Sequence, residues 1–249
     1  MDLKGKVALV TGGNGGLGQR ICRALAAAGA HIAVVCGSNI ETAEKVANDV
    51  RSLGVEAGVF KCDLQHPAEI DKMVADVVDR FGRIDILVND AAFNKAIPFD
   101  DLDALDLEIW NKIMTINLTA PLLTCKAVAP IMKRQGQGRI VNITSVAGFA
   151  PSGSSIAYAV SKAGLNHLTK CMAVALAPEV LVNGVAPGLI EGTQLTARLR
   201  PEQIERANAT ALLKKPADKD DIANQVVTMC RTDTMTGQTI VIDAGRVFH

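Results

Sequence analysis

The sequence predicts an α/β protein, in which a doubly wound sheet of seven parallel strands forms a single domain. Short runs that are apolar nearly throughout alternate with longer amphipathic stretches along all 249 residues. Strands without polar alternation are typical of a parallel sheet that helices cover on both faces. A glycine-rich turn follows the first apolar run, and no linker, repeat or low-complexity tract divides the chain. We therefore expect one domain with right-handed crossover connections.

The expected elements alternate strand with helix. The strands are Val7–Thr11, His31–Cys36, Ala57–Cys62, Ile84–Asn89, Arg139–Thr144, Val180–Val185 and Thr239–Asp243. The helices are Leu17–Ala28, Glu41–Leu53, Pro67–Phe81, Glu108–Arg134, Ala157–Leu176 and Asp218–Cys230. Residues 186–217 form a long insertion with a polar helical stretch at 201–209. An insertion after the carboxyl end of a strand is where we expect a substrate loop.

Composition excludes several classes of function. Lysine plus arginine and aspartate plus glutamate each number 26, so the chain lacks the positive charge that nucleic-acid and anionic-membrane binding mostly need. No stretch approaches the roughly eighteen apolar residues of a membrane span. The six cysteines form no C-x-x-C pair and the four histidines show no metal-ligand spacing, so we expect no metal and a reducing compartment. Because the N-terminus shows no signal-peptide pattern, the expected localisation is cytoplasmic.

A glycine-rich turn joins the first predicted strand to the first predicted helix. It reads Thr-Gly-Gly-Asn-Gly-Gly-Leu-Gly over residues 11–18. Glycines let backbone amides approach a pyrophosphate closely, and a helix N-terminus adds partial positive charge. The spacing alone is weak, because glycine-rich strand-to-helix turns are common. Its place at the first junction of a doubly wound sheet favours a dinucleotide site.

The only tyrosine of the chain, Tyr158, precedes Lys162 by one helical turn. Residues at this spacing share a helix face. A free tyrosine titrates near pH 10, and a cation about 4 Å away at an effective dielectric near 20 supplies about 4 kcal/mol, which is enough to bring the pKa of the phenol near neutral. The pair suits general acid–base work on a carbonyl or an alcohol. A single Y-x-x-x-K is otherwise mostly a pair of surface neighbours.

With these motifs the chain resembles the short-chain dehydrogenase/reductase family over essentially its whole length. Residues 11–18 match the family's cofactor turn, and Tyr158 with Lys162 matches its catalytic pair. Ser145 lies thirteen residues before Tyr158, within Asn-Ile-Thr-Ser-Val-Ala-Gly, and matches the catalytic serine. Asn117, within Ile-Asn-Leu, matches the asparagine that completes a tetrad. The resemblance implies a Rossmann-like fold and NAD(P)-dependent hydride transfer.

The resemblance also implies what these four residues do. Tyr158 would donate a proton to a carbonyl oxygen or take one from a hydroxyl group. Lys162 would lower the tyrosine pKa and bind the nicotinamide ribose. Ser145 would hydrogen-bond the substrate oxygen where charge develops, and Asn117 would kink its helix and anchor a water that leads to Lys162. A strand-end turn residue and a satisfied helical amide are the structural alternatives for Ser145 and Asn117.

A wider set of coenzyme contacts follows from the same resemblance. Asp63 would hold the adenine amino group with the help of the Leu64 amide, although a plain turn aspartate is the alternative. Residues 89–91 would line the adenine ribose, and the segment from Pro187 would cradle the nicotinamide. The expected coenzyme-binding residues are Gly12, Asn14, Gly16, Leu17, Gly18, Ser38, Asn39, Asp63, Leu64, Asn89, Ala91, Tyr158, Lys162, Pro187, Gly188, Ile190 and Thr193.

The chain departs from the family pattern at residues 89–92 and at Thr193. Asn-Asp-Ala-Ala at 89–92 replaces the usual Asn-Asn-Ala-Gly, so that Ala92 adds a methyl group where backbone commonly passes the ribose. Thr193 lies one position later than the usual threonine, which puts its expected carboxamide contact in question.

Coenzyme choice depends on the end of the second strand. Cys36 stands where NAD-preferring relatives have an aspartate, and Gly37 stands where NADP-preferring relatives often have an arginine. Gly15 occupies another position that is often basic in NADP users. Because no carboxylate excludes a 2′-phosphate, and because Ser38-Asn39 resembles the sequence of some NADP users, NADP(H) is favoured over NAD(H).

The favoured substrate is a small free carbonyl compound or its secondary alcohol. A 3-oxoacyl-[acyl-carrier-protein] reductase is an alternative, which is disfavoured because no lysine or arginine lies between Lys170 and Arg198 to dock an acidic carrier. Asn94 and Lys95 follow the fourth strand and suggest a polar or anionic substrate. A non-catalytic dinucleotide sensor is the alternative of another class, but such relatives generally lose the tyrosine or the lysine.

Assembly is expected by resemblance alone. Family members are commonly homotetramers, in which the helices at Glu108–Arg134 and Ala157–Leu176 form one interface. We expect a homotetramer, with a dimer as the alternative. The tail at residues 246–249 receives no role from the sequence.

Overall fold

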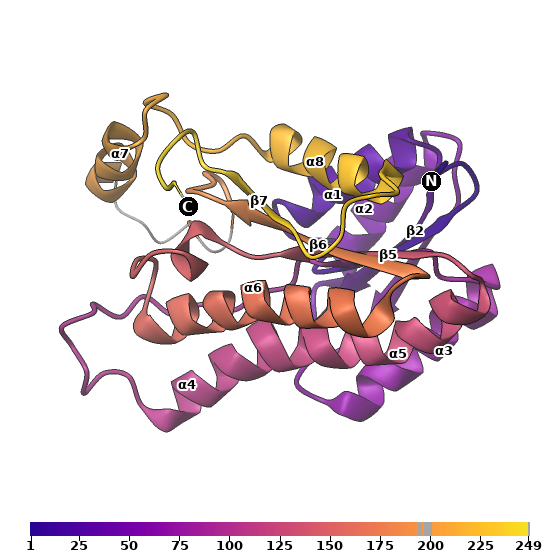
Figure 1. Cartoon of the computed structure of the whole chain (residues 1–249), viewed down its shortest axis with the longest axis horizontal. Helices are drawn as coiled ribbons and strands as arrows, with labels where there is room; N and C mark the ends of the chain where they lie inside the picture. The colour runs from indigo at the N-terminus through magenta and orange to yellow at the C-terminus, as the bar shows by residue number, and fades with distance from the viewer. Residues whose placement is uncertain (194–195, 197–200, 249) are drawn as a thin grey trace.

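The computed structural model describes residues 1–193, 196 and 201–248 and has the predicted fold, a Rossmann-like domain with one parallel sheet between two layers of helices (Figure 1). The strand order β3-β2-β1-β4-β5-β6-β7 confirms the doubly wound topology. The strands are β1 Val7–Thr11, β2 His31–Cys36, β3 Ala57–Lys61, β4 Ile86–Asn89, β5 Gly138–Ile143, β6 Val180–Pro187 and β7 Thr239–Ile242.

The described helices form two layers, with α1, α2 and α8 on one face of the sheet and α3, α5 and α6 on the other (Figure 1). Alternate residues of each strand enter the two cores: Ala8 and Val10 of β1 pack with the first layer, and Val7 and Leu9 with the second. The helices are α1 Gly18–Ala27, α2 Ile40–Arg51, α3 Pro67–Phe81, α4 Leu107–Met114, α5 Ala120–Arg134, α6 Ile156–Leu176, α7 Pro201–Thr210 and α8 Lys219–Arg231.

The helix predicted over Glu108–Arg134 is interrupted in the structure. A π-helical segment, Thr115–Thr119, joins α4 to α5 and contains Asn117. Residues 107–134 form a helical run that, judged by length and composition alone, is long and apolar enough to cross a membrane. Within this run, α5 packs against α3, α6 and the sheet and contributes buried side chains to the second core. This is the packing of a helix that covers a sheet.

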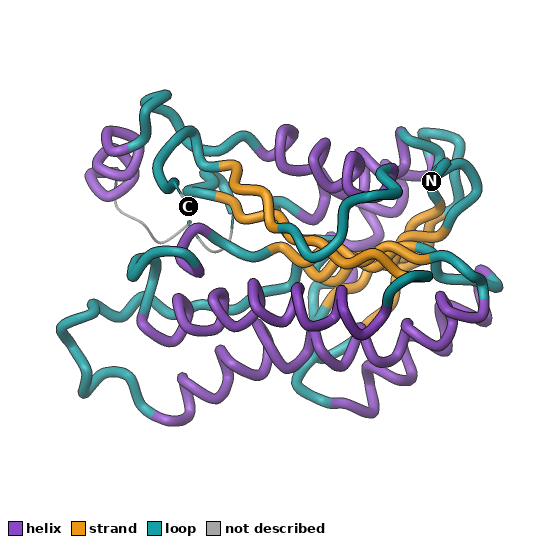
Figure 2. Tube along the Cα trace, in the orientation of Figure 1, coloured by secondary structure: helices purple, strands orange, loops and turns teal. Residues whose placement is uncertain are grey.

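The carboxyl ends of β5 and β6 share a cavity lining with Ala207 and Thr210 of α7. This is the side of the molecule that holds α7 and the C-terminus (Figure 1), where loops rather than strands form most of the surface (Figure 2). The chain leaves β1 toward β2 and β3, and after β4 it continues in the opposite direction through β5, β6 and β7. The strand order therefore reverses between β1 and β4, which are adjacent and parallel. In doubly wound sheets ligands bind outside the strand ends at this switch point.

Candidate active site

A cavity of about 800 Å³ opens at the carboxyl ends of β1, β4, β5 and β6. The cavity has two walls. The coenzyme wall consists of the turn 12–17 and the segment 90–92, and the substrate wall consists of the segment 152–154, the loop 188–193 and Arg246 of the C-terminal tail. Ser145, Tyr158 and Lys162 lie where the two walls meet.

The coenzyme wall is built from closely packed backbone. A Cβ atom on Gly12, whose φ is 66°, would lie 2.9 Å from the Ala91 Cα, and one on Gly18 would lie 2.2 Å from the Gly12 carbonyl oxygen. The Thr11 hydroxyl oxygen accepts hydrogen bonds from the backbone amides of Asp90, at 3.2 Å, and Ala91, at 3.3 Å. The glycines and Thr11 thus hold the start of α1 and the end of β4 in direct contact.

This wall fits a dinucleotide. The first turn of α1 follows the glycines directly, and Gly16 and Leu17 line the cavity, so the partial positive charge of this helix N-terminus lies beside the space that a pyrophosphate would occupy. The cavity volume is within the range for cofactor sites, about 300–1,000 Å³. Among the described residues no cluster of histidine, cysteine and carboxylate side chains could hold a metal ion.

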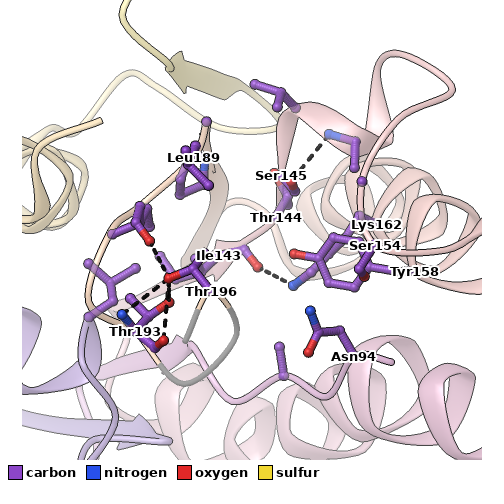
Figure 3. A pocket seen from close by; sticks show the side chains of 18 of the residues that line it. Asn94, Ile143, Thr144, Ser145, Ser154, Tyr158, Lys162, Leu189, Thr193 and Thr196 are labelled. Carbon is purple, nitrogen blue, oxygen red and sulfur yellow. Dashed lines mark hydrogen bonds between the residues drawn. The ribbon is translucent and has the colours of Figure 1, made fainter. Parts of the chain in front are cut away.

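The catalytic pair is positioned by the start of α6. Ser155 caps this helix, and its hydroxyl oxygen accepts a hydrogen bond from the Tyr158 amide at 3.2 Å. The Lys162 ammonium group lies one turn further on, donates to the Ile143 carbonyl oxygen at 2.8 Å, and is 5.8 Å from the centre of the tyrosine ring (Figure 3). Ser145, at the end of β5, lies beside Tyr158 and interacts with its phenol group. One cavity therefore holds a hydroxyl donor, a phenol and an ammonium group.

Burial and neighbouring charges shift the pKa values of this cluster. Burial raises the pKa of Tyr158, and the bond with Ser145 opposes this only in part. The Lys162 Nζ atom, which is expected to lower that pKa, donates to the Ile143 carbonyl oxygen and lies 5.8 Å from the centre of the tyrosine ring. Its effect on the phenol stays a prediction. Burial also lowers the pKa of Lys162 to about 8, while the negative charge of Asp90 favours the ammonium form.

Asn117 interrupts its helix as expected, and both polar atoms of its side chain form hydrogen bonds. It lies in the π-helical segment and is buried. Its Oδ1 atom accepts a hydrogen bond from the Phe93 amide at 2.8 Å, and its Nδ2 atom donates to the Phe93 carbonyl oxygen at 2.9 Å and to the Ser161 hydroxyl oxygen at 3.1 Å. The side chain thus ties the segment after β4 to α6, and the water relay to Lys162 stays a prediction.

Most of the expected coenzyme contacts come together in the cavity. Asn89 does not present its side chain there: it is buried, donates to the Asn142 Oδ1 atom at 2.9 Å and accepts from the Thr124 hydroxyl group at 2.8 Å. Its side chain therefore joins β4, β5 and α5. The expected residues that line the cavity are Gly12, Asn14, Gly16, Leu17, Ala91, Tyr158, Lys162, Pro187, Gly188, Ile190 and Thr193.

Five further expected contacts lie beyond the lining of the cavity. Gly18 begins α1 and is in close contact with the Gly12 backbone. Asp63 and Leu64 follow β3, and the Asp63 carboxylate accepts a hydrogen bond from the Gln65 amide, which lowers its pKa. Ser38 is exposed, and Asn39 caps α2 by accepting from the Thr42 amide at 3.0 Å. Their parts in adenine and ribose binding stay predictions.

The sequence reasoning missed residues of both walls. Asp90 lines the cavity, and burial raises its pKa to about 7 although the charge of Lys162 opposes this. Thr196 lines it too and donates to the Ile190 carbonyl oxygen at 2.8 Å. Arg246, in the tail without an assigned role, is a third. Asp90 was visible as a departure from the family pattern, whereas no local signal marked Thr196 or Arg246.

Comparisons with known proteins agree with this geometry. The short chain dehydrogenase family matches residues 6–204. The 3-oxoacyl-[acyl-carrier-protein] reductase of Synechocystis sp. is 35% identical, over 98% of this chain and 98% of its own. Human dehydrogenase/reductase SDR family member 4 is 36% identical, over 98% of this chain and 88% of its own. The crystal structure of NAD⁺-bound xylitol dehydrogenase superimposes with a TM-score of 0.91 at 30% identity, covering 98% of this chain and all of that one. The chain belongs to the short-chain dehydrogenase/reductase family.

Proposed function

We propose that this oxidoreductase interconverts a small carbonyl compound and its secondary alcohol, with Tyr158 as the general acid and base. The observation that carries the proposal is the meeting of Ser145, Tyr158 and Lys162 in one cavity with the coenzyme wall. A nicotinamide coenzyme, when bound, supplies or accepts the hydride. The side chains of this protein supply position, proton transfer and charge stabilisation.

Each of the three side chains then has a distinct part. In reduction, the Tyr158 hydroxyl group gives its proton to the substrate oxygen, and in oxidation the phenolate takes it back. The Ser145 hydroxyl group donates a hydrogen bond to the same oxygen, where negative charge develops. Lys162, with a pKa near 8, stays cationic at neutral pH and stabilises the phenolate form.

We propose NADP(H) as the preferred coenzyme. The last residue of β2 is Cys36, a buried thiol in place of an aspartate, so this position does not repel a 2′-phosphate. A Cβ atom on Gly37 would have no neighbour within 4 Å, which leaves room for a phosphate group. Ser38 is exposed there, and the N-terminus of α2 lies two residues further on, where its partial positive charge favours an anion.

The test is a titration with NADPH and then NADH, followed by nicotinamide fluorescence, on the native protein and on Tyr158→Phe. We expect both proteins to bind one coenzyme with micromolar affinity, and only the native protein to reduce ketones with it. NADH binding at least about tenfold more tightly than NADPH would overturn the coenzyme preference. Binding of neither coenzyme would overturn the proposed reaction.

A second candidate is reduction of a 3-oxoacyl thioester on an acyl carrier protein. The identity with the Synechocystis reductase favours it, and Leu212 and Leu213 leave apolar surface exposed after α7. The absence of basic residues between Lys170 and Arg198 opposes it. A 3-oxoacyl thioester tested with and without its carrier protein separates the two functions, because carrier docking raises kcat/KM only for an enzyme that recognises the carrier.

We further propose a cytoplasmic homotetramer that binds neither nucleic acid nor membranes. The six cysteines are free, and five of them are buried, which suits a reducing compartment. Leu107 of α4 and Val174 of α6 are 77% and 84% exposed. Apolar side chains this exposed on the two expected interface helices favour burial by a second subunit. Light scattering on the purified protein gives the mass that tests the tetramer.

A further inference from the structure

The C-terminal tail returns from β7 and forms part of the substrate wall. Directly after β7, the Asp243 carboxylate accepts hydrogen bonds from the backbone amides of Gly245, at 2.8 Å, and Val247, at 2.7 Å. Ala244 and Gly245 have φ angles of 58° and 77°. Two successive left-handed residues closed by one carboxylate make a tight turn, and Arg246 lies inside it.

The loop after α7 holds this turn through two backbone hydrogen bonds. The Leu212 amide donates to the Gly245 carbonyl oxygen at 3.1 Å, and the Leu213 amide donates to the Ala244 carbonyl oxygen at 3.0 Å. A Cβ atom on Gly245 would lie 3.1 Å from the Leu212 Cβ atom. The backbone around Arg246 is therefore held from two directions, and the side chain that it carries lines the cavity.

Arg246 gives the substrate wall a positive charge that no acidic side chain of the described residues pairs with. The charged residues of the described lining are Asp90, Lys162 and Arg246. Lys162 is bonded to the Ile143 carbonyl oxygen, whereas Arg246 forms no salt bridge with an acidic residue in the described part of the chain. A guanidinium group presents several N–H donors in a plane that matches a carboxylate.

The segment 152–154 of the substrate wall carries a hydroxyl group without a partner among the described residues. The Ser154 hydroxyl oxygen is buried and forms no hydrogen bond with any described residue. It lines the cavity near Tyr158, with Asn94 across from them (Figure 3). A buried hydroxyl group without a partner costs free energy that a hydrogen-bonding ligand recovers. The described residues supply no partner for the Ser154 hydroxyl group and no acidic partner for Arg246. The hydroxyl group favours a polar ligand, and the guanidinium charge independently favours an anionic one.

We propose that the substrate is a hydroxy acid or the corresponding oxo acid, whose carboxylate is bound by Arg246 while a further oxygen is hydrogen-bonded by Ser154. The inference rests on the proposed carbonyl–alcohol reaction and names its substrate class. It also moves the expected anion preference away from Lys95, which is exposed and does not belong to the lining of the cavity. The reacting carbonyl carbon remains beside Ser145 and Tyr158.

The experiment compares short oxo acids with their methyl esters, which remove the charge and keep the ketone. The native enzyme should have a higher kcat/KM for the acid. Arg246→Gln should lower kcat/KM for the acid by about 30-fold, mainly through KM, and change that for the ester by less than about threefold. Arg246→Lys should recover part of the loss, because a point charge remains. Coenzyme affinity and the thermal unfolding midpoint should stay unchanged.

Lys95→Gln is the matched control, because it removes one positive charge close to the cavity but outside its lining. It should leave the acid-to-ester ratio unchanged. Equal losses for acid and ester in Arg246→Gln, or a native preference for the ester, would overturn the inference while leaving the proposed reaction in place. If the coenzyme binds and neither acid nor ester nor a neutral ketone reacts, the proposed reaction fails and the inference fails with it.

Discussion

The two walls of the cavity are built in different ways. In the coenzyme wall, backbone atoms touch backbone atoms: the Gly18 position allows no Cβ atom, and Thr11 binds two amides of the neighbouring strand end. The substrate wall consists of side chains on segments near residues 153, 190 and 246, which are far apart in the sequence. Ser154 and Arg246 have no protein partner there among the described residues.

This difference explains how members of one family can keep the same coenzyme wall and act on many different substrates. Close backbone packing restricts the coenzyme wall to glycine at particular positions. In the proposed function this wall binds the coenzyme, which is the same whatever the substrate. Side chains on loops can change without disturbing the sheet, so the substrate wall can acquire a new charge at little cost in stability. The two walls should therefore respond differently to substitution.

Removing the phenol oxygen where the walls meet should have the largest effect. Tyr158→Phe loses the proton donor, and we expect kcat to fall by about 10³-fold, within the range for general acid–base catalysis. Coenzyme affinity and unfolding midpoint should change little, because Ser155 caps α6 through the backbone amide of residue 158. Stopped-flow turnover and coenzyme titration measure the two quantities. Retention of a tenth of the native kcat would show that another group transfers the proton.

A side chain added at the close contact between the glycine turn and α1 should destabilise the protein next to the coenzyme wall. Gly18→Ala places a methyl group 2.2 Å from the Gly12 carbonyl oxygen, and we expect it to lower the free energy of unfolding by about 3 kcal/mol, as overpacking typically does. Gly37→Ala is the control, since its Cβ atom meets nothing within 4 Å. Urea unfolding of both variants gives the difference. Similar stabilities would mean that the close approach at residue 18 relaxes freely.

The sequence predicted the elements better than it predicted their interruptions. β1 and β2 have the predicted bounds, because their apolar runs end at the glycine turn and at Gly37. β4 begins at Ile86 rather than at Ile84. The reason is Asp85, a buried carboxylate that accepts a hydrogen bond from the Val7 amide at 2.9 Å and pairs with Arg83. Such a long-range bond leaves no pattern in the apolar run.

In the site, too, features with a local sequence pattern were predicted better than features that depend on distant contacts. The glycine turn and the Tyr158–Lys162 pair are local patterns, and the structure places both in one cavity. The π-helical segment at Asn117 depends on bonds to Phe93 and Ser161, which come from other elements. Arg246 reaches the cavity only because Asp243 and residues 212–213 fold the tail back. Neither arrangement has a local signature: Asn117 received its helix kink only from the family resemblance, and Arg246 received no role.

Asp90, in the coenzyme wall, should make the stability of the protein depend on pH. Burial raises its pKa to about 7, and the buried Cys22, Tyr158 and Lys162 are the titratable groups that interact with its charge. In the unfolded chain an aspartate has a pKa near 3.9. Between about pH 4 and pH 7 the folded protein therefore keeps a proton that the unfolded chain has lost, so stability should fall as pH rises through this window and level off above it.

Asp90→Asn should remove this dependence. We expect the variant to match the native protein near pH 4 and to be more stable by about 2 kcal/mol at pH 8, because the full effect of burial is reduced by the opening of the cavity to water. Urea unfolding at pH 4.5, 6 and 8 measures the slope. Asp85→Asn is a contrasting variant: its carboxylate is paired with Arg83, and its loss should destabilise the protein. Parallel pH profiles for native protein and Asp90→Asn would contradict the assignment.

The smallest expected effect lies at Gly37, beyond the coenzyme wall at the outer edge of the proposed coenzyme site, where an added side chain could select the coenzyme. At Gly37 there is open space at the end of β2, beside the N-terminus of α2. Gly37→Arg should tighten NADPH binding by about tenfold and leave NADH binding nearly unchanged, because a guanidinium group pairs with a 2′-phosphate and not with a hydroxyl group. Gly37→Gln supplies similar length without charge, and the gain of the arginine variant over it should shrink as salt rises. If both variants gained equally, contact area rather than charge would select the coenzyme at this edge. The two walls would then differ in their backbone packing but share the way in which their side chains choose a ligand.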